Sequence, residues 1–216
     1  MSRSVPFYRR QLPFTYFYAT LGIIAVNLMF FLWNQTDPNS RSLVALNVVA
    51  VLGYGEWWQV FTYMYVHANP MHILFNMIAL FFFGLALEHN IGSWEFLIFY
   101  HVIGLLAGLF SLLSYAVLGA GGVWLMGASG AIFGVMLGYA TFRPNDRVLV
   151  FFIIPLRAMS MVLIFTAFEV FSEFLNPYSG VAHLTHLAGF LFAFFYLWIR
   201  FGLNPWTVFW NRDRYR

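Results

Sequence analysis

The chain has 216 residues, of which 62% are hydrophobic and only 9% are charged. A soluble domain carries about 25% charged residues, so this composition excludes a water-soluble protein and predicts one integral membrane domain over residues 1–216, with only short tails at its ends. The net charge of +3 comes from arginine alone, and no cysteine is present, which excludes disulfide and thiol chemistry. In a membrane protein an excess of arginine indicates which side of the membrane each loop faces. This explains the positive charge without a nucleic acid, so we expect no nucleic-acid partner.

Hydropathy predicts six membrane spans and therefore an all-α bundle. In chain order they are Phe14–Trp33, Met71–Leu87, Trp94–Leu118, Ser129–Phe142, Ala158–Phe174 and Val181–Phe201. The first apolar run follows Arg3, Arg9 and Arg10, a pattern shared with signal peptides. It is about 20 residues long, enough to span, and no small-residue cleavage site ends it, so we expect a retained helix.

The connection from Asn34 to Pro70 is too long for a simple turn. It joins a polar patch, an apolar stretch and the sequence Gly-Tyr-Gly-Glu-Trp-Trp that begins at Gly53. Tryptophan favours the headgroup level, so this segment is expected to be a loop embedded in the membrane interface. Pro144-Asn145 and Asn176-Pro177 are expected to end the fourth and fifth spans.

Arginine is distributed unevenly about the six predicted spans. Six spans put both termini on one side, and every arginine except Arg41 falls on that side. The positive-inside rule therefore predicts cytoplasmic N- and C-terminal tails. The ends that carry His67, Ser129 and Val181 then face outward, and the expected location is a bacterial cytoplasmic membrane.

Polar side chains inside spans are costly and are functional candidates by default. His72 and Asn76, four residues apart, share one face of the second span. His183 and His186 begin the last span in "VAHLTHLAGFLFA", and Ser129 begins the fourth.

Small residues form a stripe behind two of these groups. Gly130, Gly134 and Gly138 follow Ser129 at four-residue intervals, and Gly189 and Ala193 follow His186. Small residues let two helix backbones approach closely, which would bring Ser129 and His186 to the same depth near the outer face. An imidazole can then take the proton of a serine hydroxyl and activate it as a nucleophile.

Structural roles and a metal site remain alternatives for these residues. Ser129 alone fits a packing position, and His67, His89 and His101 fit hydrogen-bond donors near the interfaces. His67, His72, His183 and His186 could instead ligate zinc, copper or iron. No carboxylate lies near them in sequence, so we expect no metal and no other cofactor. Glu88, Glu169 and Glu173 are expected to make interfacial or lateral polar contacts.

Three motifs together resemble those of the rhomboid intramembrane serine proteases. They are Gly127-Ala-Ser129-Gly130, "HILFN" from His72 to Asn76, and "HLAGFLFA" from His186. They occur in the order of the family on the second, fourth and sixth spans, and the resemblance extends from about Trp57 to Ala193.

The resemblance implies a role for each motif residue. Ser129 and His186 would form a catalytic dyad without an acidic third member, in a water-filled cavity open to the outside. His72, Asn76 and the backbone N–H of Ser129 would form the oxyanion hole. The supporting residues would be Gly127, Gly130, Phe133, His183, Gly189 and His67, of which His67 ties the first loop to the core. The fifth span would be a lateral gate for substrate.

The implied activity is that of a serine endopeptidase that cuts single-span membrane proteins near the outer end of their helix. The alternative is an inactive rhomboid-like protein that binds membrane helices, and a metal-binding membrane carrier is a third reading. Two residues depart from the common family pattern. Gln59 replaces an arginine, which is expected to loosen the first loop, and Phe133 replaces a tyrosine, so its ring can stack on His186 but cannot donate a hydrogen bond.

Overall fold

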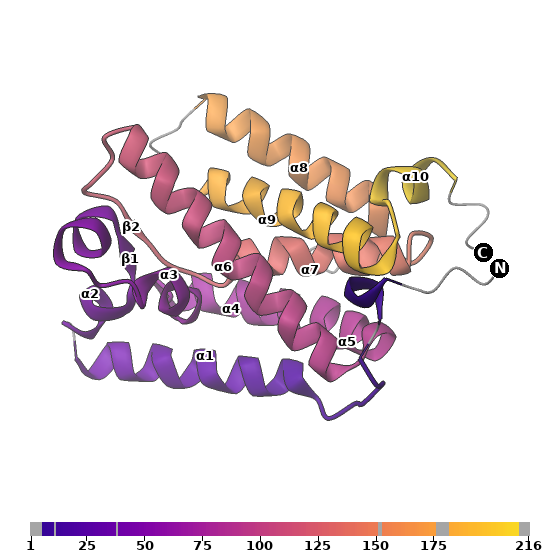
Figure 1. The fold of residues 1–216 in the computed structure, drawn as a ribbon, viewed down its shortest axis with the longest axis horizontal. Coiled ribbons are helices and arrows are strands. Elements are labelled where there is room, and N and C mark those ends of the chain that lie inside the picture. Colours follow the sequence, from indigo (N-terminus) through magenta and orange to yellow (C-terminus); the bar gives the residue numbers. More distant parts are fainter. Residues whose placement is uncertain (1–5, 11, 38, 151–152, 176–181, 212–216) are drawn as a thin grey trace.

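The computed structural model describes residues 6–10, 12–37, 39–150, 153–175 and 182–211. Within them, five helical segments are long and apolar enough to cross a membrane. These are α1 (Ala19–Thr36), the continuous run α4 (Pro70–Ala79), η4 (Leu80–Gly84) and α5 (Leu85–Ile91), then α6 (Ser93–Val117), α8 (Ala158–Leu175), and α9 (His183–Tyr196) with η5 (Leu197–Phe201). A shorter apolar helix, α7 (Ser129–Phe142), lies among them (Figure 1). The expected all-α membrane bundle is confirmed.

The central helix α7 is too short to cross a bilayer. Its 14 residues extend about 21 Å at 1.5 Å per residue, against an apolar core about 30 Å thick. Most of its side chains are buried, and it packs against α6 and α9. A polar turn, Arg143–Asp146, follows its C-terminal end, and a helix of this length that starts at one membrane surface stops short of the other.

Close contact between α7 and α9 depends on glycine. A Cβ atom at Gly189 would lie 2.0 Å from the carbonyl oxygen of Gly130, and one at Gly134 would lie 3.2 Å from the Cβ of Ala193. Gly138 does not face α9 as expected, because a Cβ there would meet Leu87 of α5 at 2.7 Å. Four residues turn an α-helix by slightly more than one full turn, so a four-residue stripe rotates away from a single neighbour.

The first span begins later than hydropathy predicts, at Ala19 instead of Phe14. Tyr18 has a left-handed backbone (φ 58°), and the amides of Ala19 and Thr20 donate to the Glu88 carboxylate at 2.7 and 2.9 Å. A negative group at a helix N-terminus satisfies the free amides there. Hydropathy places the start of this helix too early, because the carboxylate that caps it comes from a distant segment of the chain.

The long first loop contains α2 (Ser40–Val44), β1 (Leu46–Asn47), η2 (Val49–Gly53), α3 (Gln59–Thr62) and η3 (Tyr63–Tyr65). Strand β1 pairs antiparallel with β2 (Trp124–Leu125), and these pieces gather at one end of the bundle (Figure 1). Trp57 and Trp58 are more than half exposed, as expected for a loop at the membrane interface.

Gln59, which the family pattern led us to expect would loosen the first loop, is held in it by hydrogen bonds. Its side chain is fully buried. The oxygen Oε1 accepts from the Asn47 amide at 3.0 Å, and Nε2 donates to Ser42 O at 3.0 Å and to Glu56 Oε2 at 2.7 Å. A neutral amide therefore joins three parts of the loop.

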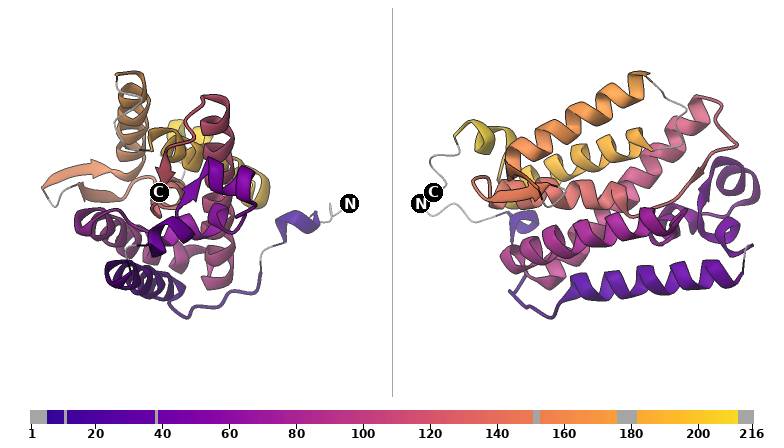
Figure 2. Two further views of the ribbon diagram at one scale, coloured as in Figure 1. Left: turned by 90° about the vertical axis from the view of Figure 1, so that its left-hand side faces the viewer. Right: turned by 180° about the vertical axis from the view of Figure 1, so that it is seen from behind.

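A β-hairpin that the sequence did not predict connects α7 to α8. Strands β3 (Arg147–Val150) and β4 (Ile154–Arg157) pair antiparallel, and Figure 2 shows them beside the helices. The turn at Pro144 ends α7 as predicted. The predicted break at Asn176-Pro177 and the predicted start of the last span at Val181 lie outside the described residues.

Both described ends of the chain lie at the end of the bundle opposite the first loop (Figure 1). The short helices there are η1 (Phe7–Arg9) and α10 (Pro205–Trp210). Arg9 Nε donates to Ile199 O at 3.2 Å, and Arg200 donates to Tyr8 O at 2.8 Å and to both oxygens of Glu95. These contacts join the N-terminal segment to η5 and α6 at this end of the bundle.

Candidate active site

Ser129 is the first residue of α7, and the segment before it determines its position. Gly127 has φ 121°, a conformation that other residues rarely adopt, and its amide donates to Tyr63 O of the first loop at 2.9 Å. A residue with a Cβ atom would therefore be strained at position 127. The Ser129 side chain is partly exposed, while Ala128 and Gly130 on either side are buried.

The structure brings Ser129 and His186 together across the α7–α9 contact. Ser129 Oγ lies 2.7 Å from His186 Nε2. The ring of Phe133, one turn along α7, stacks on the imidazole with centroids 4.3 Å apart and planes 9° from parallel. This stack restricts the plane of the His186 ring, and Phe133 makes it without the hydroxyl of a tyrosine.

A buried carboxylate lies behind His186, which the sequence analysis did not predict. Glu169 Oε1 of α8 is 3.1 Å from His186 Nδ1, and Oε2 is 2.5 Å from His183 Nδ1. All three residues are buried. The arrangement implied by the family resemblance, a serine and a histidine without an acid nearby, therefore does not describe the geometry of this chain.

Glu169 lies 17 positions before His186 and on another helix, so sequence proximity does not reveal the contact. One signal was available. A single carboxylate inside an apolar span is costly, and it is normally retained because it has a partner or a function.

His72 lies beside Ser129, against the turn at Gly127. A Cβ atom at Gly127 would be 2.7 Å from His72 Nε2 and 3.7 Å from Ser129 Oγ, so both atoms border the same small space. The Ala68 amide donates to His72 Nδ1 at 3.4 Å. Because Nδ1 accepts this hydrogen, Nε2 is the nitrogen that carries the ring hydrogen and can donate it.

Asn76 lies one turn after His72 on the same face of α4, and its side chain is buried. Its Nδ2 donates to the His72 carbonyl at 2.8 Å. An amide group has two N–H donors, so one holds the side chain in place and the other remains for a ligand.

The N-terminus of α7 adds backbone donors. The first amides of an α-helix have no partner within the helix and carry a partial positive charge. The Ser129 amide is one of these, and it donates to no other group within the described part of the chain. Together with His72 and Asn76, it could stabilise negative charge beside the hydroxyl.

His67 is fully buried where the first loop meets α4, and its ring packs edge-on to His72 with centroids 5.0 Å apart. Burial, aided by the neighbouring His72, lowers the pKa of His67 to about 3. A neutral His67 therefore joins the loop to the helix that carries His72. The other two histidines make different contacts: His101 Nε2 lies 2.7 Å from the Tyr65 hydroxyl, and His89 packs against Tyr16.

The four histidines named as possible metal ligands do not form one cluster. One pair is His67 and His72. The other is His183 and His186, and the ring centroids of this second pair are 6.4 Å apart. Glu169 joins the second pair, and the three residues each offer a ligand atom within 4.8 Å of the others. No carboxylate lies near these histidines along the sequence, but the folded chain places Glu169 beside two of them, so the expectation that they lack an anionic partner is wrong.

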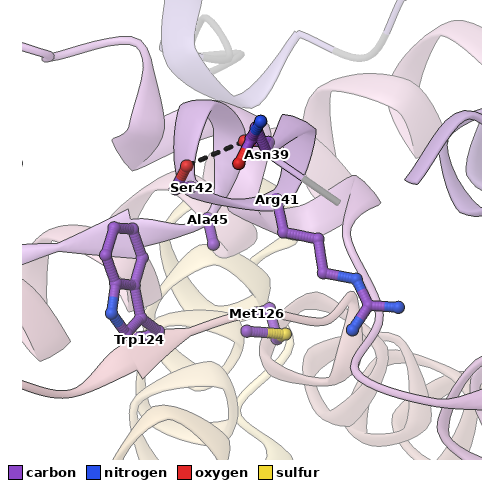
Figure 3. A pocket seen from close by; sticks show the side chains of 6 residues that line it. All are labelled: Asn39, Arg41, Ser42, Ala45, Trp124 and Met126. Atoms are coloured by element: carbon purple, nitrogen blue, oxygen red, sulfur yellow. Dashed lines mark hydrogen bonds between the residues drawn. The ribbon is translucent and has the colours of Figure 1, made fainter. Parts of the chain in front are cut away.

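A cavity of about 390 Å³ opens beside the segment that leads into the site (Figure 3). It is lined by Asn39, Arg41, Ser42, Ala45, Trp124 and Met126. Met126 directly precedes Gly127, and Arg41 Nη1 donates to Ala68 O at 3.4 Å. This hollow therefore adjoins both the Ser129 turn and the start of α4.

Comparisons with known proteins point to one family. The family model "Rhomboid domain" matches residues 54–203. The chain is 34% identical over 146 residues to the putative rhomboid protease YdcA of Bacillus subtilis (strain 168), covering 65% of this chain and 67% of that protein. It is 35% identical over 127 residues to the rhomboid protease GluP of the same strain, and 34% identical over 88 residues to the rhomboid protease GlpG of Salmonella choleraesuis (strain SC-B67).

The matches cover very different shares of these relatives. The GluP match covers 57% of this chain and 23% of GluP, and the GlpG match covers 41% of this chain and 29% of GlpG. The residues that the family model matches, 54–203, include Ser129 and His186. The chain belongs to the rhomboid family.

Proposed function

We propose that this chain is an intramembrane serine endopeptidase that cleaves single-span membrane proteins. The observation that carries the proposal is the 2.7 Å contact between Ser129 Oγ and His186 Nε2. A serine hydroxyl becomes a nucleophile when a positioned base accepts its proton, and this distance allows direct transfer. Membership of a family whose named members include proteases supports the same reaction.

In the first half of the reaction, His186 Nε2 takes the hydroxyl proton while Ser129 Oγ attacks the scissile carbonyl carbon. The carbonyl π electrons move to its oxygen and give a tetrahedral oxyanion. Its collapse breaks the C–N bond, and His186 returns the proton to the leaving amine. Water then attacks the acyl-serine with His186 as base again, which releases the acid product and restores the hydroxyl.

Three donors support stabilisation of the oxyanion. They are the amide of Ser129, the Nε2–H of His72 and the second N–H of Asn76. Donors that are fixed before the reaction stabilise the developing charge without reorganising. The bond from Asn76 to the His72 carbonyl holds one of them in place.

The substrate must expose a peptide carbonyl that a membrane helix keeps hydrogen-bonded. It therefore has to unwind locally, which favours segments with Gly, Pro or polar residues. Ser129 is the first residue of the short helix α7, at the end that the arginine distribution predicts to face outward, which supports cleavage near the outer end of the substrate helix.

Arginine distribution supports an orientation with both termini in the cytoplasm. Arg41 is the isolated cation of the first loop. The segments away from this loop carry Arg9, Arg143, Arg147 and Arg157. The corresponding location is the cytoplasmic membrane of a bacterium. Reporters fused at either terminus should report cytoplasm, and one inserted near Asn39 should report the outside; a C-terminal reporter outside would contradict the orientation.

The competing function is a rhomboid-like protein that binds membrane helices without cutting them. Retention of both the serine and the histidine argues against it. The experiment is incubation of the purified protein in detergent with a generic single-span substrate, with wild type beside Ser129→Ala. Cleavage by the wild type alone supports the protease, whereas stable binding without products from either protein supports the competitor.

A further inference from the structure

A shared carboxylate lies behind the candidate base, and the proposed function leaves it without a role. Glu169 is 5% exposed and lies on α8, which packs along α9 (Figure 1). An ionised carboxylate in an apolar environment is strongly unfavourable unless charged or hydrogen-bonding partners compensate for it. Within the described residues its close partners are the Nδ1 atoms of His183 and His186.

A carboxylate that faces Nδ1 favours one tautomer of His186. A carboxylate is an acceptor, so an Nδ1 atom that faces it is favoured in its protonated form. With the hydrogen on Nδ1, the lone pair of Nε2 faces Ser129 Oγ at 2.7 Å and can accept the hydroxyl proton. The opposite tautomer would place a hydrogen on Nε2, and the imidazole could not act as a base towards Ser129.

His183 determines how Glu169 is oriented. Oε2 is held by His183 at 2.5 Å, whereas Oε1 lies 3.1 Å from His186 Nδ1 without the alignment of an N–H···O hydrogen bond. A small rotation of either group would align the second contact once His186 becomes positively charged. The carboxylate would then stabilise the imidazolium that forms when Ser129 is deprotonated.

We propose that Glu169 is a positioning residue for the reaction, which extends the serine–histidine pair to a Ser129–His186–Glu169 arrangement held in place by His183. This inference rests on the proposed function. Glu169 does not touch the substrate and does not accept the proton in this account. It keeps His186 in the tautomer and orientation that accept a proton, and it stabilises the charged imidazole.

The direct test compares two glutamates on the same helix. Glu169→Gln removes the charge and keeps the size of the side chain, and Glu173→Gln makes the same change four residues later, at a position without a contact to His186. We expect Glu169→Gln to lower kcat by about 10² or more with KM within twofold. Glu169→Asp should recover part of kcat, and Glu173→Gln should remain within twofold of wild type. A Glu169→Gln variant that folds and retains kcat within threefold would overturn the proposal.

A spectroscopic readout keeps the inference testable if Glu169→Gln does not fold. In Ser129→Ala protein with ¹⁵N-labelled histidine, the His186 resonances should report the Nδ1–H tautomer. A dominant Nε2–H tautomer would overturn the proposal. This measurement needs no turnover. A wild type that cleaves nothing would contradict the proposed function, and the tautomer of His186 could still be measured to test the positioning role.

A metal site is the competing explanation, because Glu169, His183 and His186 could each supply a ligand. The positioning role predicts that activity survives EDTA and phenanthroline and that purified protein contains no stoichiometric zinc. Loss of activity on chelation that added zinc restores would overturn the proposal in favour of a metal centre.

Discussion

The carbonyl oxygen of Gly130 occupies the space that a side chain at Gly189 would need. A Cβ atom at position 189 would lie 2.0 Å from this oxygen, which no rotamer change can relieve because both atoms belong to the backbone. The same contact holds Ser129 and His186 at hydrogen-bond distance, since each lies within three residues of it.

Gly189→Ala is therefore expected to separate α9 from α7 and to lower kcat by at least 10², because a displacement near 1 Å between reacting groups costs about that factor. Stability should also fall, by roughly 1–3 kcal/mol from overpacking. The control is Gly22→Ala on α1, where an added Cβ meets nothing within 4 Å. Near-normal turnover in Gly189→Ala would contradict the packing account.

The two histidines of α9 should differ in importance. His186→Ala should abolish cleavage and labelling of Ser129 by a fluorophosphonate together, because the hydroxyl loses its base. His183→Ala should reduce kcat less, since it removes only the partner that orients Glu169. Steady-state kinetics and labelling rates of both variants provide the measurement. The reverse order of effects would mean that His183 is the base.

Asn76→Ala tests the oxyanion donors. Loss of one donor typically lowers kcat by about 10²–10³, or roughly 3–4 kcal/mol, with little effect on substrate affinity. We expect this decrease with nearly unchanged KM and melting temperature, and with slower but measurable serine labelling. If Asn76 only packs against neighbouring helices, the melting temperature should fall strongly while turnover stays near normal.

Acid should destabilise the protein through His67. Its pKa in the folded protein is lowered to about 3, whereas an unfolded histidine has a pKa near 6.5. The unfolded chain therefore binds a proton that the folded protein does not as pH falls below 6.5, and the stability lost at pH 5 is about 2 kcal/mol.

Unfolding of detergent-solubilised protein between pH 7 and pH 5 measures this effect. His67→Phe should reduce the loss of stability over this range more than the same change at the exposed residue His89 does. An identical pH dependence in wild type and His67→Phe would contradict a neutral, buried His67.

Much of the site geometry was accessible from the sequence because it follows from single helices. The range of α7, the face shared by His72 and Asn76, and the glycines behind Ser129 each depend on local periodicity. The pairing of Glu169 with His186 depends on how α8 is rotated and placed against α9, which no pattern within either helix encodes. The neighbour of Gly138 was mistaken for a different reason, because a stripe at four-residue intervals rotates away from a single partner along the helix.

Two further errors came from hydropathy itself. The start of α1 depends on a cap from Glu88, about 70 residues away, so apolar character alone places it too early. The strands Arg147–Val150 and Ile154–Arg157 are short and only partly buried, and hydropathy does not detect such a hairpin between two spans.

Ser129 is the residue that we propose attacks the peptide bond. The most direct measurement is cleavage of a single-span substrate by purified wild type and Ser129→Ala, combined with mass-spectrometric location of a fluorophosphonate adduct. We expect specific cleavage by the wild type, an adduct on Ser129 alone, and neither product nor adduct with folded Ser129→Ala. Cleavage by Ser129→Ala within tenfold of the wild-type rate, or an adduct on another residue, would contradict this proposal.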